Sequence, residues 1–167
     1  MNSNLLFDFI VDKENKTIHI KREFNANLEL VWQAWTTAEL LDQWWGPKPW
    51  RAETKTMDFR EGGHWLYAMV SPEGEKHWNK SSYKTIEKEK SFTFQDGFCD
   101  ENGTMNAAFP QYLWENKFIP KENNVQVDMV LTFDTLADLE KIIETGFKEG
   151  MTIDFEQLDE LLRALKK

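Results

Sequence analysis

The stretch that decides the fold is Thr17–Pro47, TIHIKREFNANLELVWQAWTTAELLDQWWGP. Its first eight residues alternate between apolar and polar side chains. Ile18, Ile20 and Phe24 share one face, and His19, Lys21 and Glu23 share the other. This period of two is typical of a strand with one buried face and one solvated face. The stretch therefore opens with a half-buried strand that ends at Phe24.

After Phe24 the apolar spacing changes to i, i+3, i+4 and i+7, which predicts an amphipathic helix. The apolar face of this helix is formed by Leu28, Val31, Trp32 and Trp35. Asn27 stands where an N-cap is needed. A capping box of Thr36 and Glu39 predicts a second short helix, which Gly46 and Pro47 end. Two short helices therefore interrupt the sheet soon after its first strand.

Downstream, the pattern predicts a meander of short strands joined by turns. The predicted strands span residues 52–59, 64–70, 78–86, 91–98, 115–119 and 125–133. Gly62-Gly63 and the run Ser71–Gly74 have the composition of tight turns, and residues 100–110 have that of a loop. Connections this short join antiparallel neighbours.

The C-terminal segment returns to helical spacing. Thr135 is a predicted N-cap, and beyond Gly146 and Gly150 a second run carries an apolar stripe. The stripe consists of Phe155, Leu158, Leu162 and Leu165. Strands followed by a terminal helix make an α+β order, and one curved antiparallel sheet wrapped around that helix would bury the stripe. We expect a single domain over residues 1–167, with a cavity between sheet and helix.

Composition excludes several classes of function. The chain has 29 acidic and 20 basic residues, and its net charge of −9 disfavours binding to nucleic acid or to anionic membranes. No stretch approaches the ~20 apolar residues of a membrane span. Cys99 is the single cysteine, so no intramolecular disulfide can form, and we expect a reducing compartment, the cytoplasm.

Several motifs, in order along the chain, resemble one family. They are Arg22–Ala26, Leu30–Thr36, Trp44–Pro47, the double-glycine segment Met57–Trp65, and the Gly146-Phe147 and Gly150 positions of the closing helix. The family is that of the homologues of the activator of heat-shock-protein-ninety ATPase. It lies within the START-like, birch-pollen-allergen-like superfamily called SRPBCC. The resemblance covers residues 17–99 and 134–166, while 100–120 cannot be aligned.

This resemblance implies a helix-grip fold with an internal pocket. For some members it implies binding to the middle domain of the chaperone. The eukaryotic activators carry an additional N-terminal domain that has no counterpart in these residues, which weakens the chaperone interpretation. The family shares no catalytic residues that could be transferred to this chain.

The residues themselves also give no sign of a metal site or of a catalytic site. His19, His64 and His77 are the only histidines, and none has a metal-ligand spacing. No nucleophile elbow, phosphate loop or dinucleotide fingerprint is present. We therefore expect no metal, no cofactor and no catalytic residue. Arg22 is interpreted as half of a structural ion pair, and the carboxylates of the terminal helix, including Asp159, as a solvated face.

The unusual feature of the composition is its aromatic share of 14%, with 8 Trp and 12 Phe. These rings form a bulky core, a lined pocket or both. Clustered Trp and Tyr favour a pocket, because their polar tips need partners that a dry core rarely supplies. The predicted cavity-lining residues are Trp65, Tyr67, Met69, Phe94, Trp114, Phe118, Met129, Leu158 and Leu162.

The leading hypothesis for function is binding of a small hydrophobic or amphipathic molecule in that cavity, without catalysis. A first alternative is a stress-related, co-chaperone-like protein that interacts with the chaperone. A second is a cavity enzyme of the cyclase or lyase type, for which the sequence offers no evident convergent acid and base.

Overall fold

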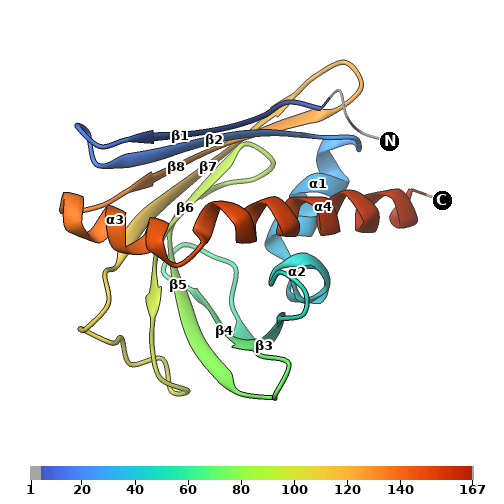
Figure 1. Ribbon diagram of the computed structural model, residues 1–167. Helices are drawn as coiled ribbons and strands as arrows, with labels where there is room; N and C mark the ends of the chain where they lie inside the picture. Colours follow the sequence, from blue (N-terminus) through green and yellow to red (C-terminus); the bar gives the residue numbers. More distant parts are fainter. Residues whose placement is uncertain (1–4, 167) are drawn as a thin grey trace.

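The computed structural model describes residues 5–166, which form an eight-stranded antiparallel sheet and four helices (Figure 1). The strands are β1 (Phe7–Asp12), β2 (Thr17–Phe24), β3 (Arg51–Met57), β4 (His64–Val70), β5 (Lys76–Glu87), β6 (Ser91–Phe98), β7 (Tyr112–Pro120) and β8 (Val125–Thr132). The helices are α1 (Leu28–Thr36), α2 (Ala38–Trp44), α3 (Leu136–Glu144) and α4 (Phe147–Leu165). The strand order is β1-β2-β8-β7-β6-β5-β4-β3.

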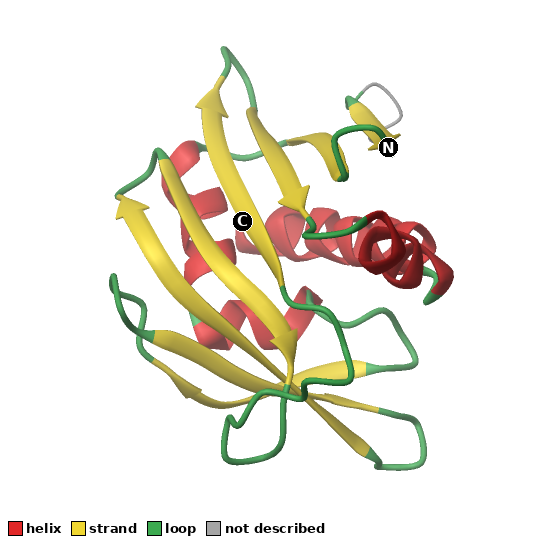
Figure 2. Cartoon of the chain, turned by 90° about the vertical axis from the view of Figure 1, so that its left-hand side faces the viewer, coloured by secondary structure: helices red, strands yellow, loops and turns green. Residues whose placement is uncertain are grey.

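The sheet curves around α4, as the sequence analysis predicted. Figure 1 shows α4 crossing the concave side, with β1 and β2 above it and β3 and β4 below. In Figure 2 the strands bend around one side of the helices. α1 and α2 close the remaining side, where α2 contacts both β3 and α4. This is an α+β helix-grip arrangement. None of the helices within residues 5–166 is long and apolar enough to cross a bilayer.

Local signals produced the expected elements at several places. The predicted bounds of β2, β4 and β6 are those of the structure. The Asn27 side chain accepts a hydrogen bond from the Leu30 amide at 2.8 Å. The Thr135 hydroxyl accepts one from the Asp138 amide at 3.0 Å. These two N-caps start α1 and α3 by satisfying amides that have no partner inside the helix.

Strand β1 was not anticipated, so the two short helices follow the second strand of the chain and not the first. β1 lies at the edge of the sheet and pairs with β2 from Phe7 opposite Arg22 to Asp12 opposite Thr17. Its sequence, FDFIVD, has apolar residues in both phases, and Ile10 is exposed. Period two is therefore weak in this segment.

The predicted capping box at Thr36 is wrong. Thr36 is the last residue of α1, and its hydroxyl donates to the carbonyl oxygen of Trp32 at 2.8 Å. Thr37 is the N-cap of α2, without a side-chain cap hydrogen bond. At the other end of the chain, Leu165 is exposed because α4 extends past the core there.

The centre of the core is aromatic. Trp35 lies within 6.5 Å, between ring centroids, of Phe24, Trp44, Phe118 and Phe155. These rings come from β2, both short helices, β7 and α4, so a single cluster ties the sheet to the helices. Around Trp35, the aromatic residues therefore form a bulky core, which is one of the two interpretations of the aromatic composition.

Candidate ligand pocket

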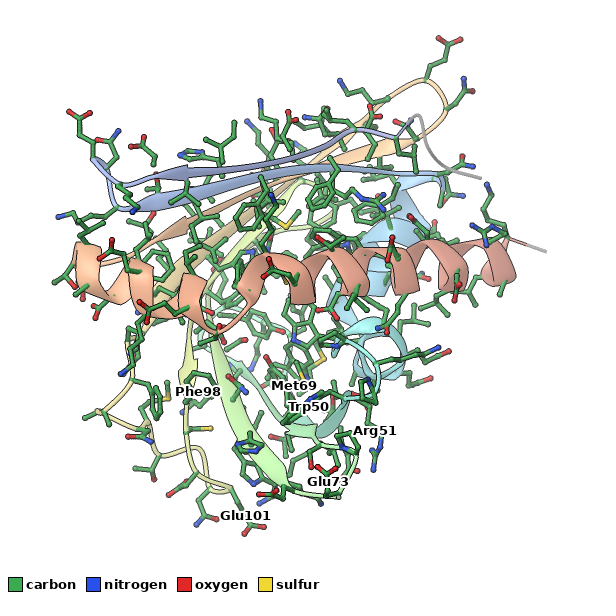
Figure 3. The ribbon with its side chains drawn as sticks, viewed as in Figure 1. Trp50, Arg51, Met69, Glu73, Phe98 and Glu101 are labelled. Atoms are coloured by element: carbon green, nitrogen blue, oxygen red, sulfur yellow. The ribbon has the colours of Figure 1, made fainter. Side chains whose placement is uncertain are left out.

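A pocket of about 280 Å³ lies between the N-terminal half of α4 and the lower part of the sheet. Its wall is formed by Trp45, Pro47, Tyr67, Met69, Asn79, Asp96, Phe98, Tyr112, Trp114, Thr145, Gly146, Phe147, Gly150, Met151 and Asp154. Figure 3 shows two of these residues, Met69 and Phe98, on the strands below α4. The pocket is therefore built by four strands, the segment after α2, and the start of α4.

Small residues at the start of α4 leave this space open. Gly146 precedes the helix in the left-handed conformation, with φ of 84°, which favours glycine. Gly150 lies one turn further along, inside the helix. A Cβ atom built on Gly150 would lie 3.6 Å from Cγ of Pro47, an ordinary van der Waals contact. Between the large side chains of Phe147 and Met151, which also border the pocket, Gly150 therefore adds no side chain that would fill it.

The aromatic wall is held by contacts among its own rings. Nε1 of Trp45 donates a hydrogen bond to the Tyr67 hydroxyl at 3.1 Å. Tyr67 stacks on Trp65 with 3.9 Å between ring centroids. Trp114 stacks with Phe94 at 5.5 Å. Because Trp45, Tyr67 and Trp114 are each fixed by contact with another ring, this part of the wall is formed before any ligand arrives.

Asp96 is the first of two buried carboxyl groups in the pocket. It lies on β6, where its Oδ1 accepts a hydrogen bond from the Ser81 hydroxyl at 3.1 Å. Burial raises the pKa of Asp96 to about 6, because an ionised carboxylate loses its hydration there. Polar contacts with Ser81, Tyr112 and the Gly97 amide partly oppose this rise. Asp96 therefore changes its charge near neutral pH.

Asp154 is the second carboxyl group, and it reaches the pocket from α4. Its Oδ1 accepts a hydrogen bond from the Gly46 amide at 3.1 Å. Burial raises the pKa of Asp154 well above its ordinary value, and the bond from Gly46 offsets only part of that rise. Both carboxyl groups, after burial itself, help to raise the pKa of Tyr67. Asp96, Asp154 and Tyr67 therefore share one electrostatic environment.

This arrangement supplies a pair of titratable groups that the sequence analysis did not find. Two carboxyl groups in differently bonded surroundings can act as an acid and a base, or can bind a cation or a hydrogen-bond donor. Among residues 5–166, no three His, Cys, Asp or Glu side chains are grouped so that they could hold a metal ion. The expectation that the protein needs no metal stays a prediction.

A second, much smaller void of about 20 Å³ lies behind the pocket and shares Trp45 and Trp114 with it. Two donors of lining residues, Nε1 of Trp35 and Nδ2 of Asn116, have no hydrogen-bond partner among residues 5–166. The Asn116 side chain does accept a bond from Nε1 of Trp114 at 2.7 Å. The void is large enough for about one water molecule but not for an organic ligand.

The structure distributes the predicted cavity residues among three places. Tyr67, Met69 and Trp114 line the pocket. Trp65 and Phe94 line the small void behind it, together with Trp114. Phe118, Met129, Leu158 and Leu162 are buried in the core cluster, and Leu162 also borders a small depression near the C-terminal end of α4.

The residues that the sequence analysis missed follow from the same periodicities that it used. On β6, Phe92, Phe94 and Asp96 occupy alternate positions, so Asp96 is the next inward residue of that face. On α4, Met151, Asp154 and Phe155 follow the i, i+3, i+4 spacing. A carboxyl group at a position where the pattern requires an apolar side chain is the signal that could have identified both.

Other candidate residues have structural roles outside the pocket. Arg22 forms the predicted ion pair, with Asp159 at 2.6 Å, and both side chains are nearly buried. Asp159 is therefore not part of a solvated face, and that expectation is corrected. Among the described residues no histidine lines the pocket: His19 and His64 contact threonine hydroxyls, and His77 lies beside Trp50.

Residues 25–163 match the family described as "Activator of Hsp90 ATPase homolog 1-like protein". A protein from Arthrobacter aurescens, solved by NMR, is 32% identical, with a TM-score of 0.88 over 94% of this chain and 91% of its own. A crystal structure of a Mycobacterium smegmatis protein is 28% identical, with a TM-score of 0.86 over 95% of this chain and 96% of its own.

A crystal structure from Nitrosomonas europaea is 27% identical, with a TM-score of 0.79 over 91% of this chain and 97% of its own. No functionally curated protein matches the chain. The family match spans most of the sequence, including every strand from β3 onward and most of α4. The chain therefore belongs to the activator of Hsp90 ATPase homolog 1-like family.

Proposed function

We propose that this protein binds a small amphipathic molecule in the pocket between α4 and the sheet. The observation that carries the proposal is a pocket of about 280 Å³ with aromatic walls and a few converging polar groups. Ligand sites in proteins commonly combine an apolar lining with a small number of placed polar groups. Of the residues predicted from sequence, Tyr67, Met69 and Trp114 are the proposed ligand contacts.

The size and polarity of the pocket restrict the ligand. Its volume is near the lower end of the range of about 300–1,000 Å³ for small-molecule sites, so the ligand is small. The rings of Trp45 and Trp114 suit an apolar body, whereas Asp96 and Asp154 suit a polar end. A purely hydrocarbon ligand would displace water from the two carboxyl groups and offer them no polar contact in exchange, at a cost in binding free energy.

The test fills the pocket without disturbing the core. Gly150→Leu adds a side chain at the pocket wall, where the first added atom makes only an ordinary contact with Pro47. Glu156→Leu, at an exposed position of the same helix, is the matched control. We expect small aromatic ligands to raise the melting temperature of the wild type and of Glu156→Leu, but not that of Gly150→Leu.

Tryptophan emission gives a second measurement, because Trp45 and Trp114 lie in the pocket wall. Ligand binding should change the emission of wild-type protein and leave that of folded Gly150→Leu unchanged. Equal thermal shifts in all three proteins would indicate binding elsewhere. No shift in the wild type with a broad set of small aromatic and aliphatic probes would contradict the proposal.

A second candidate function is interaction with the Hsp90 chaperone, which the description of the matched family favours. The cytoplasmic location that we expect for this chain is compatible both with chaperone interaction and with binding of a small molecule. We expect weak stimulation of the chaperone ATPase, because the net charge of −9 slows association with another acidic surface. Strong, saturable stimulation by the purified chain would place this function first.

A further inference from the structure

We infer that the pocket selects an organic cation, meaning a quaternary ammonium or a protonated amine on a compact aromatic or aliphatic body. This inference rests on the proposed function and names the class of ligand. It predicts that anions such as fatty acids are rejected. Three independent features of the described residues support it: the charge of the lining, the nature of the walls and the field of the whole chain.

The ionisable lining is acidic only. Asp96 and Asp154 enter the pocket from opposite sides, one on β6 and the other on α4. Among the described residues that line the pocket, none is Lys, Arg or His. Asp96 accepts a hydrogen bond from Ser81 through Oδ1 and also bonds to Tyr112 and the Gly97 amide, whereas Asp154 accepts one from the Gly46 amide through Oδ1. Neither forms an ion pair with another residue in the described part of the chain, so both remain available to a positive ligand.

The walls add a second attraction for a cation. Aromatic side chains at the pocket are Trp45, Tyr67, Phe98, Tyr112, Trp114 and Phe147. The ring faces carry negative potential, and aromatic rings attract ammonium groups most strongly where water is excluded. A quaternary ammonium needs no hydrogen-bond acceptor, so rings together with carboxylates are sufficient to hold it. An anionic head group would face rings and carboxylates without any basic partner.

The charge of the whole chain acts in the same direction. The net charge of −9 raises the local concentration of small cations and lowers that of small anions. This long-range effect is screened by salt, whereas contacts inside the pocket are screened much less. Selectivity that persists at high salt would therefore come from the pocket itself.

Cation binding should also release protons. Asp96 is protonated in part near neutral pH, and a bound cation favours its ionised form. The other titratable groups that act on or face it are Asp154, Tyr67, Tyr83, Tyr112 and Cys99. The tyrosine and cysteine pKa values are raised, so these groups stay neutral below pH 8. The carboxyl groups alone therefore couple binding to pH.

The test compares three probes of nearly equal shape: benzyltrimethylammonium, its neutral carbon counterpart neopentylbenzene, and the anion 3-phenylpropionate. We expect the cation to bind at least about ten-fold more tightly than the neutral probe. We expect the anion not to bind. The affinity for the cation should rise from pH 5 to pH 8, and calorimetry in buffers of different ionisation enthalpy should detect proton release.

Asp96→Asn and Asp154→Asn keep the shape of the side chain and an oxygen that can accept the bonds from Ser81 and Gly46. Each variant should remove most of the preference for the cation without weakening the binding of the neutral probe. Circular dichroism should show that each variant is natively folded. Asp8→Asn is the control, because it changes net charge equally at an exposed position on β1. It should leave the preference intact.

The outcomes separate the two proposals. Equal or tighter binding of the neutral probe, blocked by Gly150→Leu, would overturn the cation class and leave the pocket function standing. A cation preference that survives both asparagine variants but falls with added salt would also overturn it, since surface charge would then be the cause. Failure of all three probes to bind would count against both proposals.

Discussion

The two halves of α4 lie on the same curved sheet and have opposite characters. In the C-terminal half, Phe155, Leu158 and Leu162 are at most 1% exposed and pack in the core. In the N-terminal half, Gly150 and Asp154 line the pocket. Both halves continue one inward stripe along a single helix, so the backbone path does not distinguish them. The two halves differ in the size and polarity of the side chains on that stripe.

This comparison shows how a helix-grip domain makes a cavity without a separate element. Where the stripe carries Phe and Leu, the helix and sheet fill the space between them. Where it carries Gly150 and Asp154, an open volume remains, with a carboxyl group in its wall. The pocket is thus an unfilled section of a continuous core. This view predicts that equal truncations have unequal costs along the helix.

The largest difference is expected between Leu158→Ala and Met151→Ala. Leu158 is fully buried in the core, so its truncation should lower the free energy of unfolding by about 3–5 kcal/mol. Met151 borders the pocket and already lacks neighbours on one side, so its truncation should cost about 1–2 kcal/mol. Urea unfolding measures both. Equal losses would show that the two halves of α4 are packed alike.

The next largest effect is expected at an ion pair in the C-terminal half of α4, which is the half packed in the core and is called the packed half below. Arg22 donates to both oxygens of Asp159, at 3.2 and 2.6 Å, and its guanidinium lies over the Phe24 ring. Asp159→Asn leaves a nearly buried guanidinium without a counter-charge and should cost about 3 kcal/mol. The double variant Arg22→Met with Asp159→Leu should recover most of that loss. A double variant as unstable as the single one would contradict this account.

The packed half is also the part that the sequence predicted best. The alternation in Thr17–Phe24 and the stripe of Phe155, Leu158 and Leu162 identified β2 and the buried face of α4, because apolar periodicity reports burial directly. The order of strands and helices then led to the α+β helix-grip fold. Strand β1 escaped because Ile10 breaks its alternation.

The pocket half was harder to predict because a cavity is set by what is missing. Tyr67, Met69 and Trp114 were expected at the pocket from their rings and alternation, but these features do not separate a wall from a core. Asp96 and Asp154 were missed because polar residues were assigned to solvent. Gly150 was read as family resemblance, although its missing side chain opens the pocket.

A smaller effect, dependent on pH, should be confined to the pocket half. The Asp96 pKa is about 6 in the folded protein, above its ordinary value of 3.8, so the native state binds more protons between these values. The resulting stability is complete below pH 4 and is lost as pH rises through 6. Relative to Asp96→Asn, the wild type should lose about 2–3 kcal/mol of unfolding free energy from pH 4 to pH 7.

Chemical denaturation of both proteins across this range measures that difference, and Asp154, present in both, largely cancels. Asp159→Asn, in the packed half, retains Asp96, so the loss with rising pH that Asp96 causes should persist in that variant. A difference between wild type and Asp96→Asn that stays constant from pH 4 to pH 7 would mean that Asp96 is more hydrated than its burial indicates.

The smallest expected effect is an increase in the free energy of unfolding, whereas the effects above are decreases. Gly150→Ala replaces a glycine inside α4, and its Cβ would meet Pro47 at an ordinary contact distance of 3.6 Å. Alanine is the better helix former, so the free energy of unfolding should rise by about 0.5–1 kcal/mol. The added methyl group also takes space from the pocket and should weaken ligand binding slightly.

Higher stability with weaker binding would mean that Gly150 keeps the pocket open at the expense of helix stability. A loss of stability would mean that the helix and Pro47 are packed more tightly than this contact indicates, and the comparison between the two halves of α4 would weaken.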